Sequence, residues 1–450
     1  MNATGPASHS VPNQDACAIL IVGAGPAGLS AALAAAPSGR SIVVLDDNPA
    51  PGGQVWRHGA GAAAPGPLQQ LQKALARYPQ VRMRCGTRVV AAHGRHALLL
   101  ESADSAWVQG FEQLILCTGA RELLLPFPGW TLPGVTGAGG LQALIKNGLP
   151  VRGQRIVIAG SGPLLLAAAA SATQAGAQVV RVAEQSSWSQ VAAFGAGLLR
   201  WPSKLVQAAA LLPPAYRCDS YVLAAQGETS LQSVQLRQGA HTVRLDCERL
   251  AVGFGLVPQV ELGRLLGCAT RRSAQGGWAL QVDAEQITSV SHIFAAGECT
   301  GAGGAELSMA EGHIAGLAAI GQAAVAAQLQ TRARWQGFAH RVDKHFALRP
   351  ELRTMAQPDT LLCRCEDVAY GSVAACKGWN DAKLHQRCGM GACQGRICGA
   401  AAHYLFGWEA PSPRPPLSPA RVSTLSLAGQ DSAALPCPPQ TSPKGGGPCP

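Results

Sequence analysis

The chain has 450 residues, which is long enough for two or three domains, each with a core of its own. Only 14% of the residues are charged and 53 are glycine, a composition that excludes a disordered chain and favours a compact fold with glycine-rich turns. The net charge of +10 is not concentrated in any long run of Lys or Arg, which argues against a nucleic-acid-binding protein.

The apolar stretches and the cysteines bear on the compartment in which the protein works. The longest apolar stretch, residues 314–329, is too short to cross a membrane. Residues 1–16 are polar, lack an apolar signal core and are predicted to be disordered. We therefore expect a cytoplasmic protein without a membrane span, in which the 15 cysteines are thiols or metal ligands rather than disulfides.

Residues 18–46 predict a βαβ unit of the kind that binds a dinucleotide. A short apolar strand leads into a glycine turn, an alanine-rich helix and a second strand, which ends at Asp46. The glycines permit a tight turn, let a pyrophosphate approach the backbone and let the helix pack close to the strand, while the acid lies where a ribose would bind. The predicted binding residues are Gly23, Gly25, Pro26, Ala27, Gly28 and Asp46.

The loop after Asp46 indicates which dinucleotide is bound. Residues 52–57 read GGQVWR. An acid followed by a Gly-Gly loop resembles the flavoproteins with two dinucleotide-binding domains. The fuller GGQxWR wording resembles the α subunits of opine oxidase, hydrogen cyanide synthase and D-hydroxyproline dehydrogenase. This resemblance implies FAD as the cofactor, with Gly53, Gln54 and Arg57 in its binding site.

Two later segments resemble the parts of the same flavoproteins that complete the FAD site. An apolar strand ends at Thr118-Gly119, and another ends at Gly297-Glu298. In the superfamily, the first closes the nucleotide domain near FAD, and the acid of the second, usually Asp, bonds the ribityl chain. The resemblance implies that all four residues contact FAD. It also implies one FAD-binding domain made of residues 17–150 and 281–330.

A second βαβ unit begins at residue 155 and predicts a second dinucleotide-binding domain over residues 151–280. Its turn contains Gly160 and Gly162, and its second strand ends at Glu184, but Leu165 stands where the third glycine belongs. A leucine there spaces the helix away from the strand and loosens the pyrophosphate cradle. NAD(P), another nucleotide and a vestigial site therefore all stay open for this unit.

The C-terminal part divides into a connector, a cysteine-rich region and a tail. Residues 331–360 are rich in Arg and His with a helical pattern, which predicts a solvated connector. Residues 411–450 contain 11 prolines without periodicity, which predicts a disordered tail. Between them, six of the 15 cysteines fall within residues 363–398. Thiolates gathered in this way suit zinc or an iron–sulfur cluster.

The wording CRCE…GMGxCQGxxC resembles the domain of the bacterioferritin-associated ferredoxin type, which is appended to the α subunits named above and to anaerobic glycerol-3-phosphate dehydrogenase. The resemblance implies a small helical [2Fe–2S] domain over residues 361–410. The ligands that it implies are Cys363, Cys365, Cys393 and Cys398, with Cys388 as the alternative to Cys398. A structural zinc site stays open as well, although CxC and Cx4C spacings are unusual for zinc.

The whole chain is therefore predicted to be an α/β protein, in which a Rossmann-like FAD domain is interrupted by a Rossmann-like nicotinamide-type domain and followed by the [2Fe–2S] domain. The resemblance implies an FAD-dependent oxidoreductase α subunit that relays electrons through FAD and the cluster. The electrons would come from an opine, an imino or D-amino acid, or glycine, oxidised on a D-amino-acid-oxidase-like β subunit. They would pass to a downstream acceptor, which would keep the chain in the cytoplasm or bring it to the face of the inner membrane.

No candidate for substrate chemistry stands near the flavin motifs, so no catalytic side chain is identified and FAD itself is expected to be the redox centre. Two alternatives stay open. One is a self-sufficient NAD(P)H-dependent flavin reductase that uses the second βαβ unit. The other is a non-catalytic scaffold subunit that holds a structural zinc.

Overall fold

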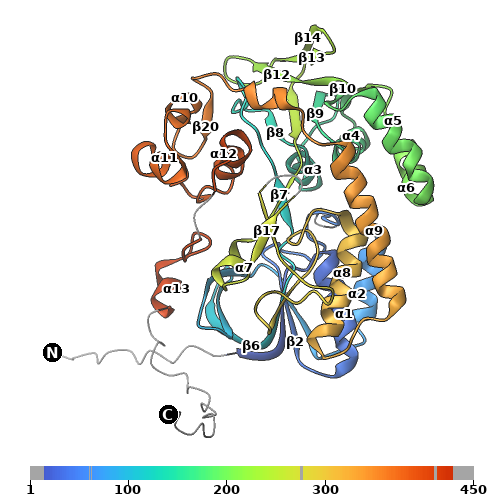
Figure 1. Cartoon of the computed structure of the whole chain (residues 1–450), viewed down its shortest axis with the longest axis vertical. Helices are drawn as coiled ribbons and strands as arrows, with labels where there is room; N and C mark the ends of the chain where they lie inside the picture. Colours follow the sequence, from blue (N-terminus) through green and yellow to red (C-terminus); the bar gives the residue numbers. More distant parts are fainter. Residues whose placement is uncertain (1–14, 60, 62, 274–276, 410–412, 429–450) are drawn as a thin grey trace, which may run out of the picture.

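The computed structural model describes residues 15–59, 61, 63–273, 277–409 and 413–428. Two α/β domains lie one above the other in Figure 1, with a small cysteine-rich domain on one side and the long helix α9 (Ala326–His345) on the other. The predicted fold class is confirmed, since both larger domains are built on parallel sheets and the C-terminal region is mainly helical.

The first domain is built on a seven-stranded sheet in the order β3-β2-β1-β6-β5-β4, with β19 paired to β6. The strands β4 and β5 form an antiparallel wing, while the others run parallel. All of β2 is buried, as expected of a central strand in a parallel sheet. The strands are β1 (Asp15–Val22), β2 (Ile42–Leu45), β3 (Val81–Arg84), β4 (Arg88–Ala92), β5 (Ala97–Glu101), β6 (Ala106–Leu116) and β19 (Ile293–Ala295).

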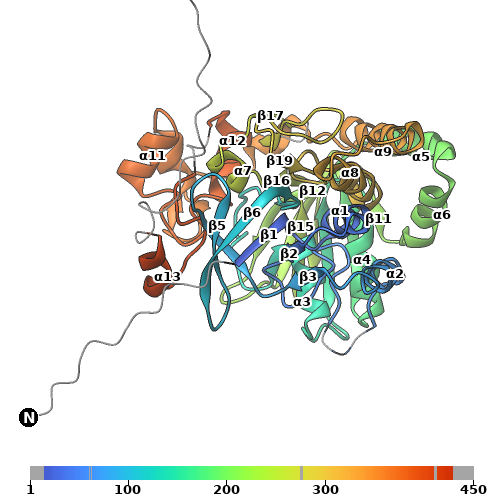
Figure 2. The ribbon, with the colours of Figure 1, turned by 90° about the horizontal axis from the view of Figure 1, so that it is seen from below.

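Two helices of this domain, α1 (Pro26–Ala35) and α8 (Gly304–Ala319), cross at close range beside the sheet (Figure 2). The crossing requires glycine. A Cβ on Gly312 would lie 2.1 Å from the backbone oxygen of Ala27, and one on Gly316 would lie 2.3 Å from that of Ala31. Because α8 holds α1 so tightly, the N-terminus of α1 is fixed at the glycine turn. The short 3-10 helix η1 (Ala36–Ser38) follows α1 in the chain. The helix α2 (Gly66–Leu75) packs beside α1.

The second domain is built on a five-stranded parallel sheet in the order β11-β10-β9-β15-β8, with a three-stranded antiparallel sheet, β12-β13-β14, next to it. Its strands are β8 (Val135–Gly137), β9 (Arg155–Gly160), β10 (Gln178–Glu184), β11 (Tyr216–Arg217), β12 (Ser220–Gln226), β13 (Ser233–Gln238), β14 (His241–Asp246) and β15 (Arg249–Gly253). Its helices are α3 (Ala138–Lys146), α4 (Leu164–Gln174), α5 (Trp188–Gly197), η2 (Leu198–Arg200) and α6 (Pro202–Leu211).

The boundaries between these domains differ from those predicted at residues 150 and 281. The strand β8 pairs with β15 in the second sheet, and α3 packs against β15, so residues 135–146 belong to the second domain. The chain returns earlier too, through β16 (Leu256–Pro258), which pairs with β7 (Ala120–Glu122), and then through α7 (Glu261–Leu265), β17 (Thr270–Arg272) and β18 (Trp278–Leu280). Leu262 and Leu280 are buried in the core of the first domain. These strands and the helix α7 have only three to five residues each, too few to show a period in the sequence.

The helix α9 carries no fully buried residue, in agreement with a solvated connector, but it is anchored by aromatic contacts. The ring of Phe338 meets that of Trp201 edge-on at 5.7 Å between centroids. The chain then passes through η3 (Pro350–Thr354) into the cysteine-rich domain, which has a core of its own. That domain contains β20 (Leu361–Cys363), β21 (Val368–Ala369), α10 (Tyr370–Ala374), α11 (Trp379–Gln386) and α12 (Cys398–Phe406).

The two predicted disordered ends need correction where the structure describes them. Asp15 and Ala16 are already part of β1, and residues 1–14 lie outside the described residues. Residues 413–428 of the tail return to the first sheet and include the helix α13 (Val422–Leu427). Arg421 donates through Nη1 to the backbone oxygen of Ala103 (2.7 Å), and its backbone N–H donates to Glu101 (3.0 Å). Residues 411, 412 and 429–450 lie outside the described residues as well.

The structure also bears on the prediction that no segment crosses a membrane. None of the helices formed by the described residues combines the length and the apolar character that a span requires.

Candidate functional site

The glycine turn between β1 and α1 opens onto a cavity of about 380 Å³, which we call the first cavity. Gly23 has a φ of 111°, and a Cβ there would lie 2.1 Å from the backbone oxygen of Cys117. A Cβ on Gly28 would lie 1.8 Å from the backbone oxygen of Gly23. A Cβ on Gly53 would lie 3.0 Å from the Cα of Gly25, so the Gly-Gly loop lies directly against the turn. The turn therefore leaves bare backbone beside the N-terminus of α1, where a diphosphate binds.

Asp46 lies at one end of the first cavity, directly after β2, and is 7% exposed. Its Oδ2 accepts a hydrogen bond from the backbone N–H of Ala24 (2.7 Å), and its Oδ1 accepts one from that of Asn48 (2.8 Å). Arg57 does not line the cavity. Its guanidinium donates to the side-chain oxygen of Asn48 and so supports the loop that carries Asp46. Arg57 thus acts on the loop rather than in the cavity where the prediction put it.

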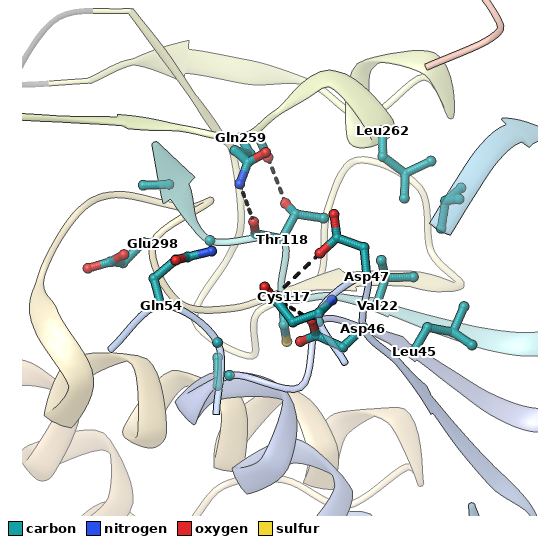
Figure 3. A pocket seen from close by; sticks show the side chains of 18 of the residues that line it. Val22, Leu45, Asp46, Asp47, Gln54, Cys117, Thr118, Gln259, Leu262 and Glu298 are labelled. Carbon is teal, nitrogen blue, oxygen red and sulfur yellow. Dashed lines mark hydrogen bonds between the residues drawn. The ribbon is translucent and has the colours of Figure 1, made fainter. Parts of the chain in front are cut away.

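Figure 3 shows Glu298 at the opposite end of the first cavity from Asp46, with Gln54 and Thr118 between them. Thr118 Oγ1 donates to the backbone oxygen of Gln259 (2.7 Å), and Gln259 Nε2 donates to that of Thr118 (2.9 Å). This reciprocal pair fixes the end of β6 against the chain that returns from the second domain. The other predicted residues that line the cavity are Gly23, Gly25, Pro26, Ala27, Gly53 and Gly119.

The turn that carries Glu298 is held by an acid that the sequence analysis missed. Glu311, in α8, is 5% exposed and accepts hydrogen bonds from the backbone N–H of Gly297 (2.9 Å) and from Thr300 Oγ1 (3.1 Å). Burial raises the pKa of Glu311 to about 7, although both hydrogen bonds lower it. Burial also raises the pKa of Glu298, against a hydrogen bond from the N–H of Gly304. Gly297 therefore contributes to the site through its backbone N–H, whose hydrogen bond to Glu311 holds the turn that carries Glu298.

The second glycine turn is built differently from the first. Glu184 has no exposed surface, and its carboxylate accepts hydrogen bonds from the backbone N–H groups of Gly162 (2.7 Å) and Ser186 (2.8 Å). Burial raises the pKa of Glu184 to about 7. Gly160 and Gly162 are both buried, whereas Gly23 and Gly25 are not. Leu165, at the third position, is fully buried beside Gly253.

The cysteine-rich domain gathers all five of the predicted or alternative ligands. The sulfur atoms of Cys363, Cys388 and Cys398 lie within 4.8 Å of one another, and all three residues are buried. Cys365 and Cys393 form a more exposed pair with 3.9 Å between their sulfurs. The two groups adjoin, because Cys363 of the first group and Cys365 of the second are only two residues apart in the chain. Five thiols in one place fit a metal centre held by cysteine.

Glycines explain how the loop around these cysteines is shaped. The ring of Trp379 lies against the backbone: a Cβ on Gly389 would lie 2.6 Å from it, and one on Gly395 would lie 2.8 Å from it. The backbone N–H of Gly389 also bonds to the sulfur of Cys363, which lowers a thiol pKa that burial raises. Hydrogen bonds of this kind tune cysteine-bound iron–sulfur clusters. The glycines of the GMG and QGR motifs thus let Trp379 pack against the loop, and Gly389 also donates a hydrogen bond to the sulfur of Cys363.

The cysteine loop borders the first cavity through Arg396, which the sequence analysis did not single out. Arg396 lies between Cys393 and Cys398 and lines the cavity. Its backbone oxygen accepts a hydrogen bond from Arg121 Nε (3.1 Å), and its guanidinium donates to the backbone oxygen of Leu417 in the tail. No period in the sequence marks these contacts, because the partners are 275 and 21 residues away.

Residues 17–330 match the family described as pyridine nucleotide-disulphide oxidoreductases. The chain belongs to this family. It is a flavin-dependent oxidoreductase, and it belongs with the α subunits whose GGQxWR and CQGxxC motifs it shares. FAD is therefore the cofactor that the first cavity fits, since its glycine turn and its ribose-side acid are both in place.

Two relatives extend over nearly the whole chain. It is 31% identical to the HcnB subunit of hydrogen cyanide synthase from Pseudomonas protegens, covering 92% of this chain and 98% of the relative. It is 30% identical to one of the subunits of opine oxidase from Rhizobium meliloti, covering 90% of this chain and 98% of that relative. The fold resembles the crystal structure of L-proline dehydrogenase from P. horikoshii, with a TM-score of 0.64 at 16% identity over 93% of this chain and 81% of that one.

Proposed function

We propose that this member of the family is the electron-relay subunit of a hetero-oligomeric oxidoreductase that acts on carbon–nitrogen bonds. The substrate is an opine, an imino or D-amino acid, or glycine, and it is oxidised on a separate β subunit that resembles D-amino-acid oxidase. FAD takes up two electrons together, and a [2Fe–2S] cluster passes them on singly toward a downstream acceptor. The relatives support this proposal, since they are named as subunits of hydrogen cyanide synthase and opine oxidase.

The observation that carries the proposal is the place of Arg396. It lies in the loop between Cys393 and Cys398 and also lines the first cavity, so the metal ligands and the FAD site share a wall. In the proposal, Cys363, Cys365, Cys393 and Cys398 hold the cluster. The chain supplies binding and orientation: the first glycine turn holds the diphosphate of FAD, and Asp46 holds its ribose.

The lining of the first cavity supports placing the substrate chemistry on the partner. Among its described lining residues there is no histidine, and the one thiol is that of Cys117. Burial raises the pKa of Cys117 well above its ordinary value, so this thiol stays protonated and unreactive. The described lining therefore offers neither a histidine nor a reactive thiol for amine oxidation.

The test is a visible absorption spectrum of the anaerobically purified full chain, together with iron, sulfide and zinc analysis. We expect flavin bands, a broad shoulder to longer wavelength and about two irons per chain. Zinc without iron would contradict the relay and favour a scaffold role. Rapid bleaching of the flavin by NADH or NADPH alone would instead favour a self-sufficient reductase.

A further inference from the structure

A second cavity, of about 450 Å³, lies between the second glycine turn, the N-terminus of α8 and the helix α9. Its walls are largely aromatic and apolar, with the rings of Phe254, Phe338, Phe346 and Tyr404 around it. Arg353 lines it as well and lies over the ring of Tyr404, 5.2 Å from its centroid. Glu298 and Asp343 also line this partly open space, but most of its wall is aromatic and apolar, which suits a flat apolar ring.

The chain itself occupies the side of this space that would receive the pyrophosphate and adenosine of a dinucleotide. Ser161 Oγ donates to the backbone oxygen of Phe346 (2.8 Å), and Gln185 Nε2 donates to that of Ala347 (3.1 Å). The backbone N–H of Arg349 donates back to Gln185 Oε1 (3.0 Å). These three hydrogen bonds seal the segment 346–349 onto the turn. The ring of Phe346 adds to the seal, because a Cβ on Gly162 would lie 3.7 Å from it.

The second cavity adjoins both predicted redox sites. Glu298 lines both cavities, so the two spaces share a wall at the end of the FAD site farthest from Asp46. On the other side, Tyr404 belongs to α12, the helix that begins at Cys398. A ring bound in the second cavity would therefore lie beside the FAD site and beside the domain that holds the cysteines.

We propose that the second cavity binds a quinone and excludes NAD(P). The guanidinium of Arg353 offers the N–H donors that a quinone oxygen accepts, and the aromatic walls hold the ring. A quinone takes up two electrons and two protons to become a hydroquinone, and a fully reduced flavin releases the same number on returning to its oxidised form. This inference rests on the proposed function for the source of the electrons. The binding itself needs only the residues described here.

The experiment measures binding by isothermal titration calorimetry on the full, FAD-loaded, oxidised chain. The probe is duroquinone, whose ring has no open position for the free thiols of this chain to attack. Val342→Trp and Ala339→Phe each fill the cavity from α9, and Ala333→Trp is the matched control on an exposed part of the same helix. We expect one saturable site per chain, weakened by about tenfold or more in both filling variants and unchanged in the control, with no heat from NADH.

Three results would overturn the inference: no saturable binding of duroquinone, equal binding in the filling variants, or binding of NADH in preference to the quinone. The wild-type chain alone decides the first and the third, so they do not depend on the folding of a variant. The flavin absorption of the same sample separates this inference from the proposed function. If the chain carries FAD but binds no quinone, the quinone site is rejected and the electron-relay proposal stands. If the chain is purified without FAD, the electron-relay proposal itself is contradicted.

Discussion

Arg121 and Arg396 join the FAD domain to the cysteine-rich domain through a hydrogen bond of 3.1 Å between Arg121 Nε and the backbone oxygen of Arg396. Arg121 is held in turn by Glu261, whose Oε1 lies 2.8 Å from its Nη1. The pair sits where the cysteine loop meets the first cavity. Replacing Arg121 therefore tests whether the shared wall matters for electron passage.

Arg121→Ala should slow the passage of electrons from flavin to cluster while leaving the FAD content unchanged. Loss of one hydrogen bond and of one ion pair whose side chains are only 20% and 22% exposed should also cost about 1–2 kcal/mol of stability. The measurement is the appearance of the reduced-cluster signal by electron paramagnetic resonance after photoreduction of the flavin. Arg82→Ala removes an exposed arginine on β3 and serves as the control. Equal rates in both variants would show that the contact is only structural.

The five gathered cysteines make a ligand series informative. We expect Cys365→Ser, Cys393→Ser and Cys398→Ser each to lose the cluster, while Cys388→Ser keeps about two irons per chain, because four cysteines suffice for a [2Fe–2S] centre. Iron and sulfide analysis checks this. If Cys388→Ser loses its iron and Cys398→Ser keeps it, then Cys388 is the fourth ligand and Cys398 is not.

The matched control for that series is Cys376→Ser. Cys376 is a cysteine of the same domain, but its sulfur donates to the backbone oxygen of Ser372 (3.3 Å) and is not among the gathered five. This variant should keep its iron, its sulfide and its visible spectrum. Loss of iron from it would show that the assay reports on folding of the domain rather than on ligation.

Asp46→Ala should weaken FAD binding by about tenfold to a hundredfold. The substitution removes the acceptor for the N–H of Ala24 and leaves that buried donor unpaired, at a cost of about 1–3 kcal/mol. The ratio of flavin to protein absorbance after dialysis measures the loss, and Glu285→Ala, at an exposed acid, controls for a general effect of charge. Full retention of FAD by Asp46→Ala would remove this acid from the binding site.

The buried acids Glu184 and Glu311 predict how stability depends on pH. Burial raises the pKa of each to about 7 from an ordinary value of 4.5. The folded chain therefore binds these protons more tightly than the unfolded chain does, and stability should fall as the pH rises from about 4.5 to about 7. Calorimetric Tm values across this range measure the slope.

Glu311→Gln should flatten part of that slope, because its amide oxygen still accepts from Gly297 but no longer titrates. Glu285→Gln, at an exposed acid, should leave the slope as in the wild type. A slope that is the same in Glu311→Gln and in the wild type would assign the pH dependence to other groups.

Short-range patterns in the sequence predict where the two glycine turns form and which cysteines come together. Gly23, Gly25 and Asp46 lie within one βαβ unit, so their spacing alone brings them together. Glu311 and Arg396 could not be found in this way, since each acts on a residue that only the tertiary fold brings near. The closing of the second turn by Phe346 was equally hidden, because that residue follows the turn by 185 positions. Leu165 was the one local sign that this turn departs from the first.

The return of residues 413–428 to the first sheet constrains how the cysteine-rich domain can move. Leu417 donates its backbone N–H to the backbone oxygen of Val90 (2.7 Å), lies buried, and lines the first cavity. The domain is therefore tethered on both sides, by the segment 346–349 before it and by this segment after it. A domain that carries electrons by moving from one partner to another must be attached at one end only. Within the described part of this chain, the cysteine-rich domain is attached at both ends. Electron transfer here should accordingly proceed over a fixed gap, at a rate insensitive to solvent viscosity.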